Sequence, residues 1–176
     1  MPKSSNRLAL IGMMGAGKST VAEILHTQWG FPWVDVDRKV EERFGAPVAT
    51  IFRDRGEAAF RALEREVMLE ICQSPGPTIV SLGGGAPMDP DCQRLLAEEF
   101  WVAWLDAPAS VLYARAQSPE RPLANLGFEA FEALFQGRRR TYQRLSDVTV
   151  DVSVRSASSV ADDITKWWKD EKHVRV

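Results

Sequence analysis

The chain has 176 residues, and its 22 lysines and arginines against 24 aspartates and glutamates give a formal net charge of −2. Hydrophobic residues make up 45% of the sequence and include eight Phe and six Trp, so the chain can fold around a core, and disorder as the default is excluded. The balanced charge gives no general reason to expect nucleic acid or an acidic membrane surface as a partner. Any site for an anion must therefore be local.

Cysteine usage and hydropathy bear on the cellular compartment. Cys72 and Cys92 are too few for a disulfide framework or a cysteine-rich metal site, which favours a reducing, cytoplasmic location. The apolar stretch 8–17 faintly resembles part of a signal peptide, but Lys18 ends it without a clear cleavage site. No apolar run approaches the roughly 18 to 20 residues of a membrane span, so we expect a chain that is neither secreted nor membrane-embedded.

Short apolar segments alternate with longer helical patterns along the chain, as is typical of β–α units that build a mainly parallel sheet. The expected strands are residues 8–11, 33–36, 78–82, 101–105 and 148–152. Apolar residues recur at helical spacing in two segments, and these residues are Phe60, Leu63, Val67 and Ile71, then Val160, Ile164, Trp167 and Trp168. We expect one domain over residues 1–176, with a Pro-rich mobile lid at about 117–128.

A phosphate-binding loop follows the first expected strand. The sequence GMMGAGKS at 12–19 matches G-x-x-x-x-G-K-[ST] and leads into a helical pattern over 20–29. The loop N–H groups and the helix N-terminus can cradle phosphate oxygens, Lys18 can reach the β- and γ-phosphates, and the Ser19 hydroxyl can ligate magnesium. The alternative is an ordinary glycine-rich turn with a solvated Lys18.

The nucleotide site alone leaves switches, motors, ATPases and small kinases open. No Asn-Lys-x-Asp motif occurs, and no Asp-x-x-Gly follows a strand, so a GTP-binding switch is disfavoured. The chain is also short for the additional domains of motors or transporters. A compact metabolite or nucleotide kinase is favoured.

Two carboxylates end the second expected strand, in the sequence DVD at 35–37. Alternation along a strand would send Asp35 and Asp37 to the same face, at the sheet edge beside the phosphate loop. One carboxylate could then hold the magnesium shell while the other accepts a hydrogen bond from a substrate hydroxyl. The alternative is that both residues cap the helix that follows.

Three consecutive glycines, Gly83, Gly84 and Gly85, follow the third expected strand. Residues without a Cβ let a ligand approach the backbone closely and receive main-chain N–H groups. A flexible turn is the alternative. The position of the glycines, on the same edge as the phosphate loop and the aspartates, favours a function in binding.

Arginines supply candidate anion ligands on the acceptor side. Arg61 lies in an expected helix, Arg121 in the Pro-rich loop, and residues 138–140 form an arginine run in another helix. Planar guanidinium groups suit carboxylates and phosphates. Alternatively, Arg61 pairs with Glu57 or Glu64 on a solvated face and the run is a helix surface.

Taken together, these segments resemble shikimate kinase over nearly the whole chain. The segments that carry the resemblance are GMMGAGKST at 12–20, DVD at 35–37, FRALE at 60–64, SLGGGA at 81–86, RPL at 121–123 and RRRTY at 138–142. The resemblance implies transfer of the γ-phosphoryl group of ATP to the 3-hydroxyl of shikimate, on the route to chorismate and the aromatic amino acids. It also implies a small P-loop kinase fold, an α/β fold with five parallel strands flanked by helices, similar to nucleoside monophosphate kinases.

The resemblance implies roles on the nucleotide side. The residues that would hold the ATP phosphates are Gly15, Ala16, Gly17, Lys18, Ser19 and Thr20. Ser19 with Asp35 would serve Mg²⁺. Arg115 and Arg155 fall near the adenine-contacting positions of the family, and Arg121 would descend with the lid onto the transferring phosphoryl group.

On the acceptor side, the resemblance implies a substrate-binding region at about 36–64. Asp37 would bind acceptor hydroxyls and position, or take a proton from, the attacking one. Arg61 and Arg138 would grip the shikimate carboxylate, and the backbone of 83–85, chiefly at Gly84, would meet the ring.

The arginine run departs from the family pattern. The family usually reads R-x-P-L-Y where this chain has RRRTY at 138–142. Counting back four residues from Tyr142 selects Arg138, and Arg139 takes its place if the helix phase differs.

Two other functions stay open. Another small P-loop kinase, for gluconate or a nucleoside monophosphate, is disfavoured by the triple glycine and the F-R-x-x-E segment. A nucleotide-binding regulatory protein that has lost phosphoryl transfer is disfavoured by the intact Lys18, Ser19, Asp35, Asp37 and Arg121. The expected partners are ATP and shikimate, with no nucleic acid and no membrane, and the expected state is a monomer.

Overall fold

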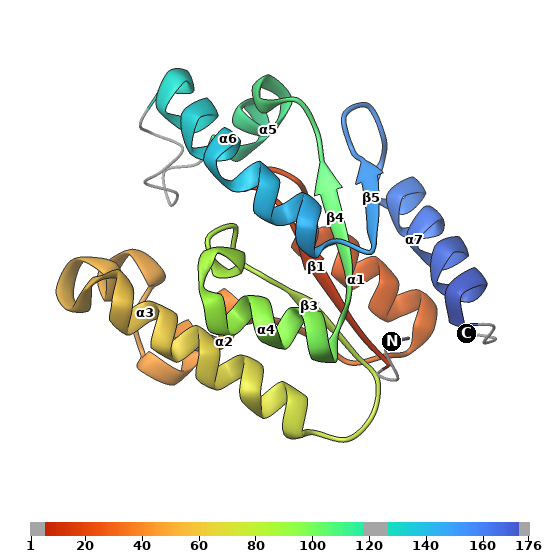
Figure 1. The fold of residues 1–176 in the computed structure, drawn as a ribbon, viewed down its shortest axis with the longest axis horizontal. Coiled ribbons are helices and arrows are strands. Elements are labelled where there is room, and N and C mark those ends of the chain that lie inside the picture. Colours follow the sequence, from red (N-terminus) through yellow and green to blue (C-terminus); the bar gives the residue numbers. More distant parts are fainter. Residues whose placement is uncertain (1–5, 118–126, 173–176) are drawn as a thin grey trace.

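The computed structural model describes residues 6–117 and 127–172. The elements in chain order are β1 (Arg7–Ile11), α1 (Lys18–Trp29), β2 (Trp33–Asp35), α2 (Val36–Phe44), α3 (Val48–Gln73), β3 (Thr78–Ser81), the 3-10 helix η1 (Ala86–Met88), α4 (Pro90–Glu99), β4 (Trp101–Asp106), α5 (Ala109–Ala116), α6 (Phe128–Leu145), β5 (Val148–Asp151) and α7 (Ala157–Lys172). Figure 1 shows their arrangement around one central sheet.

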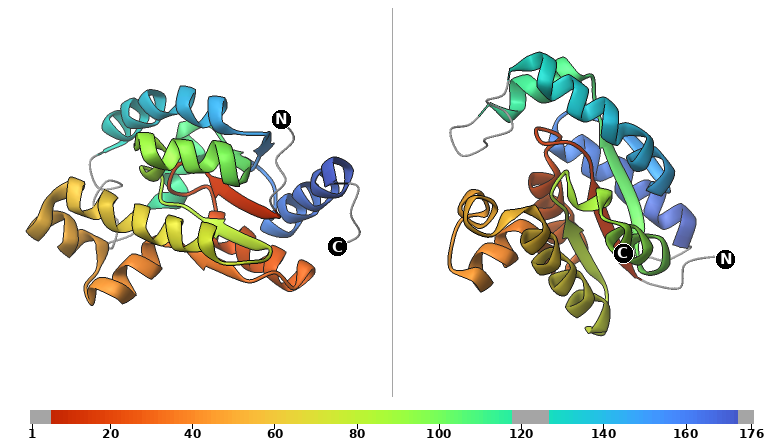
Figure 2. Two further views of the ribbon diagram at one scale, coloured as in Figure 1. Left: turned by 60° about the horizontal axis from the view of Figure 1, so that its bottom comes forward. Right: turned by 60° about the vertical axis from the view of Figure 1, so that its left-hand side comes forward.

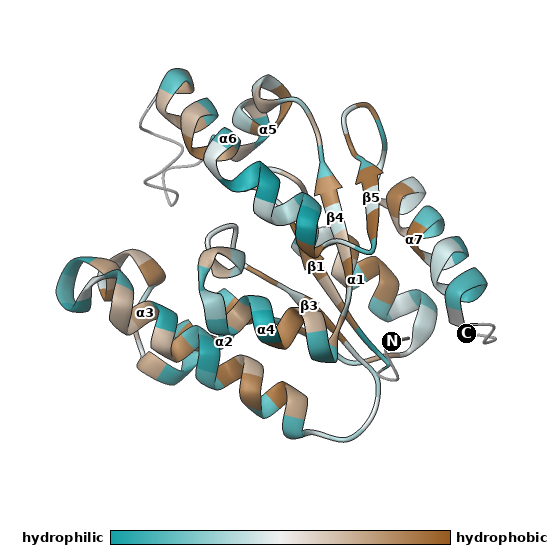
Figure 3. Ribbon diagram, in the orientation of Figure 1, coloured by the Kyte–Doolittle hydropathy of each residue, from teal (hydrophilic) through white to brown (hydrophobic). Residues whose placement is uncertain are grey.

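The sheet has five strands in the order β2-β3-β1-β4-β5, and every pair is parallel. This confirms the expected fold class and the five expected strands, with boundaries that differ by a residue. Brown bands recur along β1, β3, β4 and β5 in Figure 3, because these strands are rich in apolar residues, as expected for a parallel sheet that helices cover on both faces. Since all strands run the same way, the loops after β1, β2 and β3 meet at one edge.

Two tryptophans on β4 show which helices cover which face. Trp101 and Trp104 are three residues apart, so their side chains point to opposite faces of the sheet. The ring of Trp101 lies 5.9 Å from that of Trp167 on α7, and the ring of Trp104 lies 6.0 Å from that of Tyr142 on α6. Helix α1 packs with α7 on one face, and α4 packs with α6 on the other.

The second strand is shorter than the sequence pattern predicts. Strand β2 ends at Asp35, and Val36 already begins α2. The Asp35 side chain accepts a hydrogen bond from the N–H of Arg38 at 3.2 Å and thereby caps this helix. The prediction that strand alternation turns both aspartates to one face is therefore wrong, because Asp37 belongs to the first turn of α2.

Helix α3 changes direction at Gly56. This glycine has a φ of 81° and a ψ of 171°, so the helical backbone is interrupted between residues 55 and 57. Helices α2 and α3 pack against each other, and Figure 2 shows the pair on a different side of the molecule from α5 and α6.

An arginine on β1 joins several elements at the amino end of the sheet. The guanidinium of Arg7 donates to the carbonyl oxygens of Cys72 and Ser74, at 2.7 and 3.0 Å, and pairs with Glu99 at 3.1 Å. Cys72 and Ser74 lie at the end of α3 and Glu99 at the end of α4.

In the described residues, no helix is both long and apolar enough to span a membrane.

Candidate active site

The phosphate loop connects β1 to α1. Helix α1 begins at Lys18, directly after Gly17, and the Lys18 ammonium donates to the carbonyl oxygens of Gly12 and Met13 at 2.9 and 3.1 Å. Close packing requires glycine in this loop: a Cβ on Gly12 would lie 2.5 Å from the Leu105 carbonyl oxygen at the end of β4. The loop is thus held against β4, with the first N–H groups of α1 available at its end.

Two oxygen ligands suited to magnesium lie beside this loop. The Ser19 hydroxyl donates to Asp35 Oδ2 at 2.6 Å. The hydroxyl of Ser81, at the end of β3, lies 3.3 Å from the Ser19 hydroxyl. Among the described residues, no group of three or more His, Cys, Asp or Glu side chains could enclose a metal ion. This sparse oxygen set fits Mg²⁺, which commonly keeps several waters and binds substrate phosphates as well as one or two protein ligands.

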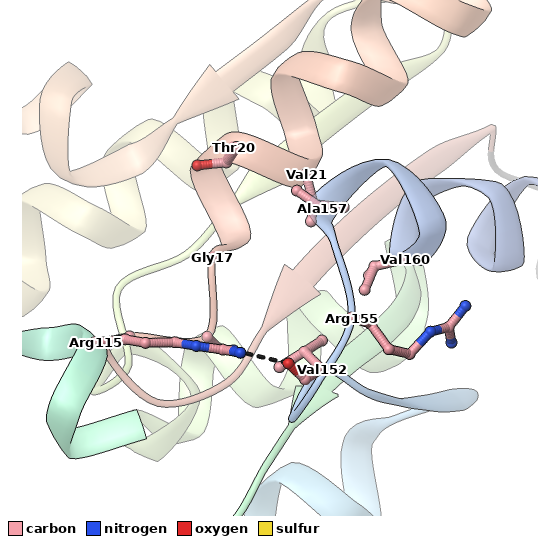
Figure 4. Close-up of a pocket in the computed structure, with 10 residues that line it drawn as sticks. Gly17, Thr20, Val21, Arg115, Val152, Arg155, Ala157 and Val160 are labelled. Carbon is pink, nitrogen blue, oxygen red and sulfur yellow. Dashed lines mark hydrogen bonds between the residues drawn. The ribbon is translucent and has the colours of Figure 1, made fainter. Parts of the chain in front are cut away.

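A pocket of about 260 Å³ opens next to the phosphate loop (Figure 4). Its lining combines the loop residues Gly15, Ala16 and Gly17 with Thr20, Val21, Arg115, Val152, Arg155, Ala157 and Val160. Arg115 donates to the carbonyl oxygens of Val152 and Ser153, both at 2.7 Å, and so joins α5 to the loop after β5. Arg155 forms an ion pair with Asp163 on α7. The structure thus places both predicted adenine-side arginines in the lining of the pocket beside the phosphate loop.

Asp37 lies at the same edge of the sheet as the phosphate loop. Its Oδ1 is buried and has no hydrogen-bond partner within the described part of the chain. Burial, and next the negative charge of Asp35, raise the pKa of Asp37 to about 6, while Lys18 and Arg61 act in the opposite direction. Most of this carboxyl is therefore ionised at neutral pH, and it can accept a hydrogen bond from a hydroxyl.

Arg61 on α3 is held by two glutamates. It pairs with Glu57 at 3.2 Å and with Glu64, and its side chain is only 14% exposed. Its guanidinium lies over the rings of Phe52 and Phe60, at 5.9 and 5.3 Å from their centroids. The pairing that the sequence suggests is therefore present, but on a buried face rather than a solvated one.

Glu64 is itself buried. Its side chain is 5% exposed, and burial raises its pKa to about 7, against the lowering effect of Arg61. One carboxylate oxygen, Oε1, has no hydrogen-bond partner in the regions that the structure describes. A buried carboxyl of this kind fixes the orientation of the arginine while it remains partly protonated near neutral pH.

The arginine run on α6 separates into distinct environments. The Arg138 Nη1 lies 3.7 Å from the sulfur of Met13 in the phosphate loop. Arg139 instead pairs with Asp106 at 2.9 Å and lies over the rings of Trp104 and Phe135. Arg138 is thus the member of the run that lies beside the phosphate loop, at the position that counting back from Tyr142 selects.

The triple glycine makes room for side chains of the chain itself. A Cβ on Gly83 would lie 2.7 Å from Asp37 Oδ1, and a Cβ on Gly85 would overlap the Arg61 guanidinium. A Cβ on Gly84 would lie 3.3 Å from the Tyr142 hydroxyl and 3.4 Å from Arg138 Nη1. Asp37, Arg61 and Arg138 therefore gather around one loop because each glycine admits a different side chain.

One predicted residue of the site lies outside the described structure, and two residues that the structure places at the site were not predicted from the sequence. Arg121, with the rest of 118–126, lies outside the described residues. Sequence reasoning treated Glu64 only as a possible surface partner and Tyr142 only as a reference for counting. The i,i+3 spacing of Arg61 and Glu64 within F-R-x-x-E is a local signal for Glu64, whereas nothing local marks Tyr142 as a neighbour of Gly84.

Comparisons with known proteins agree with this geometry. The family model described as "Shikimate kinase" matches residues 14–169. A shikimate kinase of Persephonella marina is 34% identical over 156 residues, which are 88% of this chain and 94% of the relative. A shikimate kinase of Lactococcus lactis subsp. cremoris is 36% identical over 167 residues, 93% of this chain and 99% of the relative.

Solved structures give the same result. Shikimate kinase from Acinetobacter baumannii in complex with shikimate superposes with a TM-score of 0.90 at 26% identity, over 97% of this chain and 96% of that one. Deoxyadenosine kinase from M. mycoides with bound dATP has a TM-score of 0.63 at 15% identity, over 93% of this chain and 99% of that one. The second likeness shows a shared kinase fold only.

Proposed function

The chain belongs to the shikimate kinase family and phosphorylates shikimate with ATP on the route to the aromatic amino acids, and we propose that Asp37 positions the attacking hydroxyl. The supporting observation is that the loop after β3 gathers Asp37, Arg61 and Arg138 opposite the phosphate loop. The 3-hydroxyl of shikimate would hydrogen-bond to the Asp37 carboxylate, and the ring carboxylate would bind the two guanidinium groups.

On the donor side, the proposal assigns the phosphates of ATP to residues 15–20, with Lys18 at the β- and γ-phosphates. The pocket lined by Arg115 and Arg155 would take the adenine end of the nucleotide. Ser19 and Asp35 would hold Mg²⁺, which supplies charge neutralisation at the phosphates.

Asp37 has chemistry suited to this transfer. Phosphoryl transfer has a loose transition state, so rate depends mainly on alignment of donor and acceptor and on neutralisation of charge. A carboxyl with a pKa of about 6 is ionised at neutral pH yet basic enough to accept the hydroxyl proton as the bond to phosphorus forms. Lys18, on the opposite side, would stabilise the charge on the transferring group.

The remaining expectations complete the proposal. Arg121 would contact the transferring phosphoryl group from a lid at about 117–128, and about 36–64 would form the acceptor-binding region of a single domain. We expect Arg121→Ala to lower kcat by about 10³ to 10⁵, by analogy with arginine fingers. The chain would act in the cytoplasm as a monomer, with no nucleic-acid or membrane partner.

A coupled ADP-release assay with ATP and Mg²⁺ tests the proposal. Shikimate should stimulate ADP release far above the acceptor-free control, and chelation of the metal should abolish the stimulation. Gluconate and nucleoside monophosphates should not replace shikimate. Activity on one of these acceptors alone would overturn the assigned acceptor residues, and ATP binding without any turnover would support a regulatory protein.

A further inference from the structure

The side chain of Tyr142 is fully buried between the acceptor and phosphate loops. Its exposed fraction is 0%, and it lies on α6 four residues after Arg138, so both side chains project from the same face of the helix. A phenylalanine could supply the same ring packing against Trp104, which lies 6.0 Å away. Ring packing therefore does not account for the hydroxyl group of this residue.

The Tyr142 hydroxyl has two polar neighbours. It donates a hydrogen bond to the carbonyl oxygen of Gly84 at 2.5 Å, and the Arg138 guanidinium lies close enough to interact with it electrostatically. The sulfur of Met13 lies 4.0 Å from the same oxygen, which brings the phosphate loop into this cluster. One oxygen atom thus links α6, the loop after β3 and the loop after β1.

The charge of Arg138 is not neutralised by these neighbours. Its contacts, a phenol and a thioether, are neutral, and none of the ion pairs found within residues 6–117 and 127–172 includes it. Arg139, the next residue, is instead neutralised by Asp106. Burial raises the pKa of Tyr142 to about 12, so the phenol is protonated and neutral near neutral pH.

We propose that the Tyr142 hydroxyl is a positioning group, which holds the Arg138 guanidinium and the Gly84 peptide in the arrangement that binds the acceptor carboxylate. Contact with a neutral phenol orients the planar group of the arginine without competing for its charge. This inference rests on the proposed role of Arg138 in carboxylate binding.

The first test is Tyr142→Phe, with Tyr113→Phe as the matched control. Tyr113 on α5 packs edge-on against Phe128 and Phe131 and lies outside the proposed site. We expect Tyr142→Phe to raise the KM for shikimate about tenfold, because the polar contact beside the Arg138 guanidinium and the bond to Gly84 are lost, while the KM for ATP changes less than twofold. An unchanged shikimate KM, or equal losses for both substrates, would contradict the positioning role.

A double-mutant cycle separates this inference from the role of Arg138. Arg138→Met alone should weaken shikimate binding strongly, and adding Tyr142→Phe to it should cause less than a further twofold loss. If Arg138→Met binds shikimate like the parent, the carboxylate assignment fails. If Arg138→Met weakens binding but the two effects multiply, the assignment stands and the positioning role fails.

A measurement without substitution of Tyr142 guards against a variant that does not fold. The chain has only two tyrosines, so Tyr113→Phe protein labelled with [ζ-¹³C]tyrosine gives a single resonance, from Tyr142. Saturation with shikimate should shift this resonance, because the ligand carboxylate binds the guanidinium next to the phenol, whereas ADP should shift it much less. A resonance that does not move with shikimate would overturn the proposal.

Discussion

Asp37 combines a proposed chemical role with an unfavourable position for a charge. Its Oδ1 is buried without a hydrogen-bond partner in the described part of the chain, and Asp35 and Glu41 add negative charge nearby. The pKa is raised from 3.8 to about 6, so the folded state holds this proton more tightly than the unfolded chain does. The ionised carboxylate therefore destabilises the fold at the pH where it is needed.

Asp37→Asn should consequently separate activity from stability. Shikimate-dependent turnover should be lost with ATP binding retained, while the free energy of unfolding at about pH 8 should rise by about 1 to 3 kcal/mol. The gain should shrink toward pH 4, where the parent carboxyl is protonated. Urea unfolding at both pH values measures this, with Asp170→Asn on the exposed face of α7 as a control. Loss of nucleotide affinity in Asp37→Asn would instead place this residue in the metal or phosphate site.

Gly85 shows how much the acceptor site depends on one missing methyl group. Its backbone has an ordinary helical conformation, φ −89° and ψ −19°, so alanine meets no backbone penalty there. The obstacle is the Arg61 guanidinium, which occupies the space of a Cβ. Gly85→Ala should displace Arg61 and raise the KM for shikimate by about 10- to 100-fold, because a charge-assisted contact is lost.

The ATP side provides the internal comparison for Gly85→Ala. The KM for ATP should change little, because the nucleotide pocket contains no part of this loop. A shikimate KM that stays within twofold of the parent would show that Arg61 does not need this position. A matched rise in both KM values would show a general distortion.

At the scale of elements, helix α6 carries both functional and purely structural positions. Gly137 lies inside it, next to Arg138, and a Cβ there would meet no atom within 4 Å. Glycine in a helix interior is less favourable than alanine, so Gly137→Ala should stabilise the fold by about 1 kcal/mol and raise Tm by about 2 to 4 °C. Thermal unfolding and the shikimate KM, which should not change, test this. A lower Tm would mean that α6 needs the glycine.

The elements also show what local sequence patterns can predict. The phosphate loop, the strands and their order along the chain follow from short-range signals, because glycine spacing and apolar runs are local properties. The end of β2 was missed because Asp35 acts as a helix cap, and a D-x-D sequence has no marker that separates a strand end from a cap. Asp35 and Asp37 therefore lie next to the phosphate loop for a different reason from the strand alternation that the sequence suggests.

The rest of the site depends on contacts between distant segments. Tyr142 and Gly84 are 58 residues apart in sequence, and their hydrogen bond depends on how α6 lies across the sheet. The pairing of Arg61 with Glu64 is local, but its burial is not, since it arises from the loop that contains Gly85. Burial and long-range contacts, which set the pKa values and the choice between Arg138 and Arg139, need the folded structure.

For the whole molecule, two groups of carboxyls, whose pKa values are shifted in opposite directions, set how the free energy of unfolding depends on pH. Asp37 and Glu64 have raised pKa values, about 6 and about 7, so the stability they contribute is present below their unfolded pKa values and is lost as pH rises through these values. The carboxyls with lowered pKa values are exposed. The weak stabilisation they give is present above their unfolded pKa values and is lost as pH falls through their lowered values.

Stability and activity should therefore peak at different pH values. Unfolding free energy should be highest at mildly acidic pH and fall toward pH 8, whereas kcat/KM for shikimate should fall below about pH 6 as Asp37 becomes protonated. Urea unfolding and initial rates across this range measure the two profiles. The Asp37→Asn, Glu64→Gln double variant should flatten the stability profile, and coincident maxima in the parent would contradict the prediction.

The Arg7 contacts fasten the amino end of the sheet, opposite the catalytic edge. They join β1 to chain positions 65 to 92 residues away, so β1, the end of α3 and the end of α4 cannot separate one at a time without breaking the same guanidinium contacts. Backbone amides at this end should exchange with deuterium only through global unfolding, while amides at the loops of the opposite edge exchange through local opening. We therefore expect slow exchange at the amino end of the sheet, while the substrate-binding loops at the opposite edge open independently.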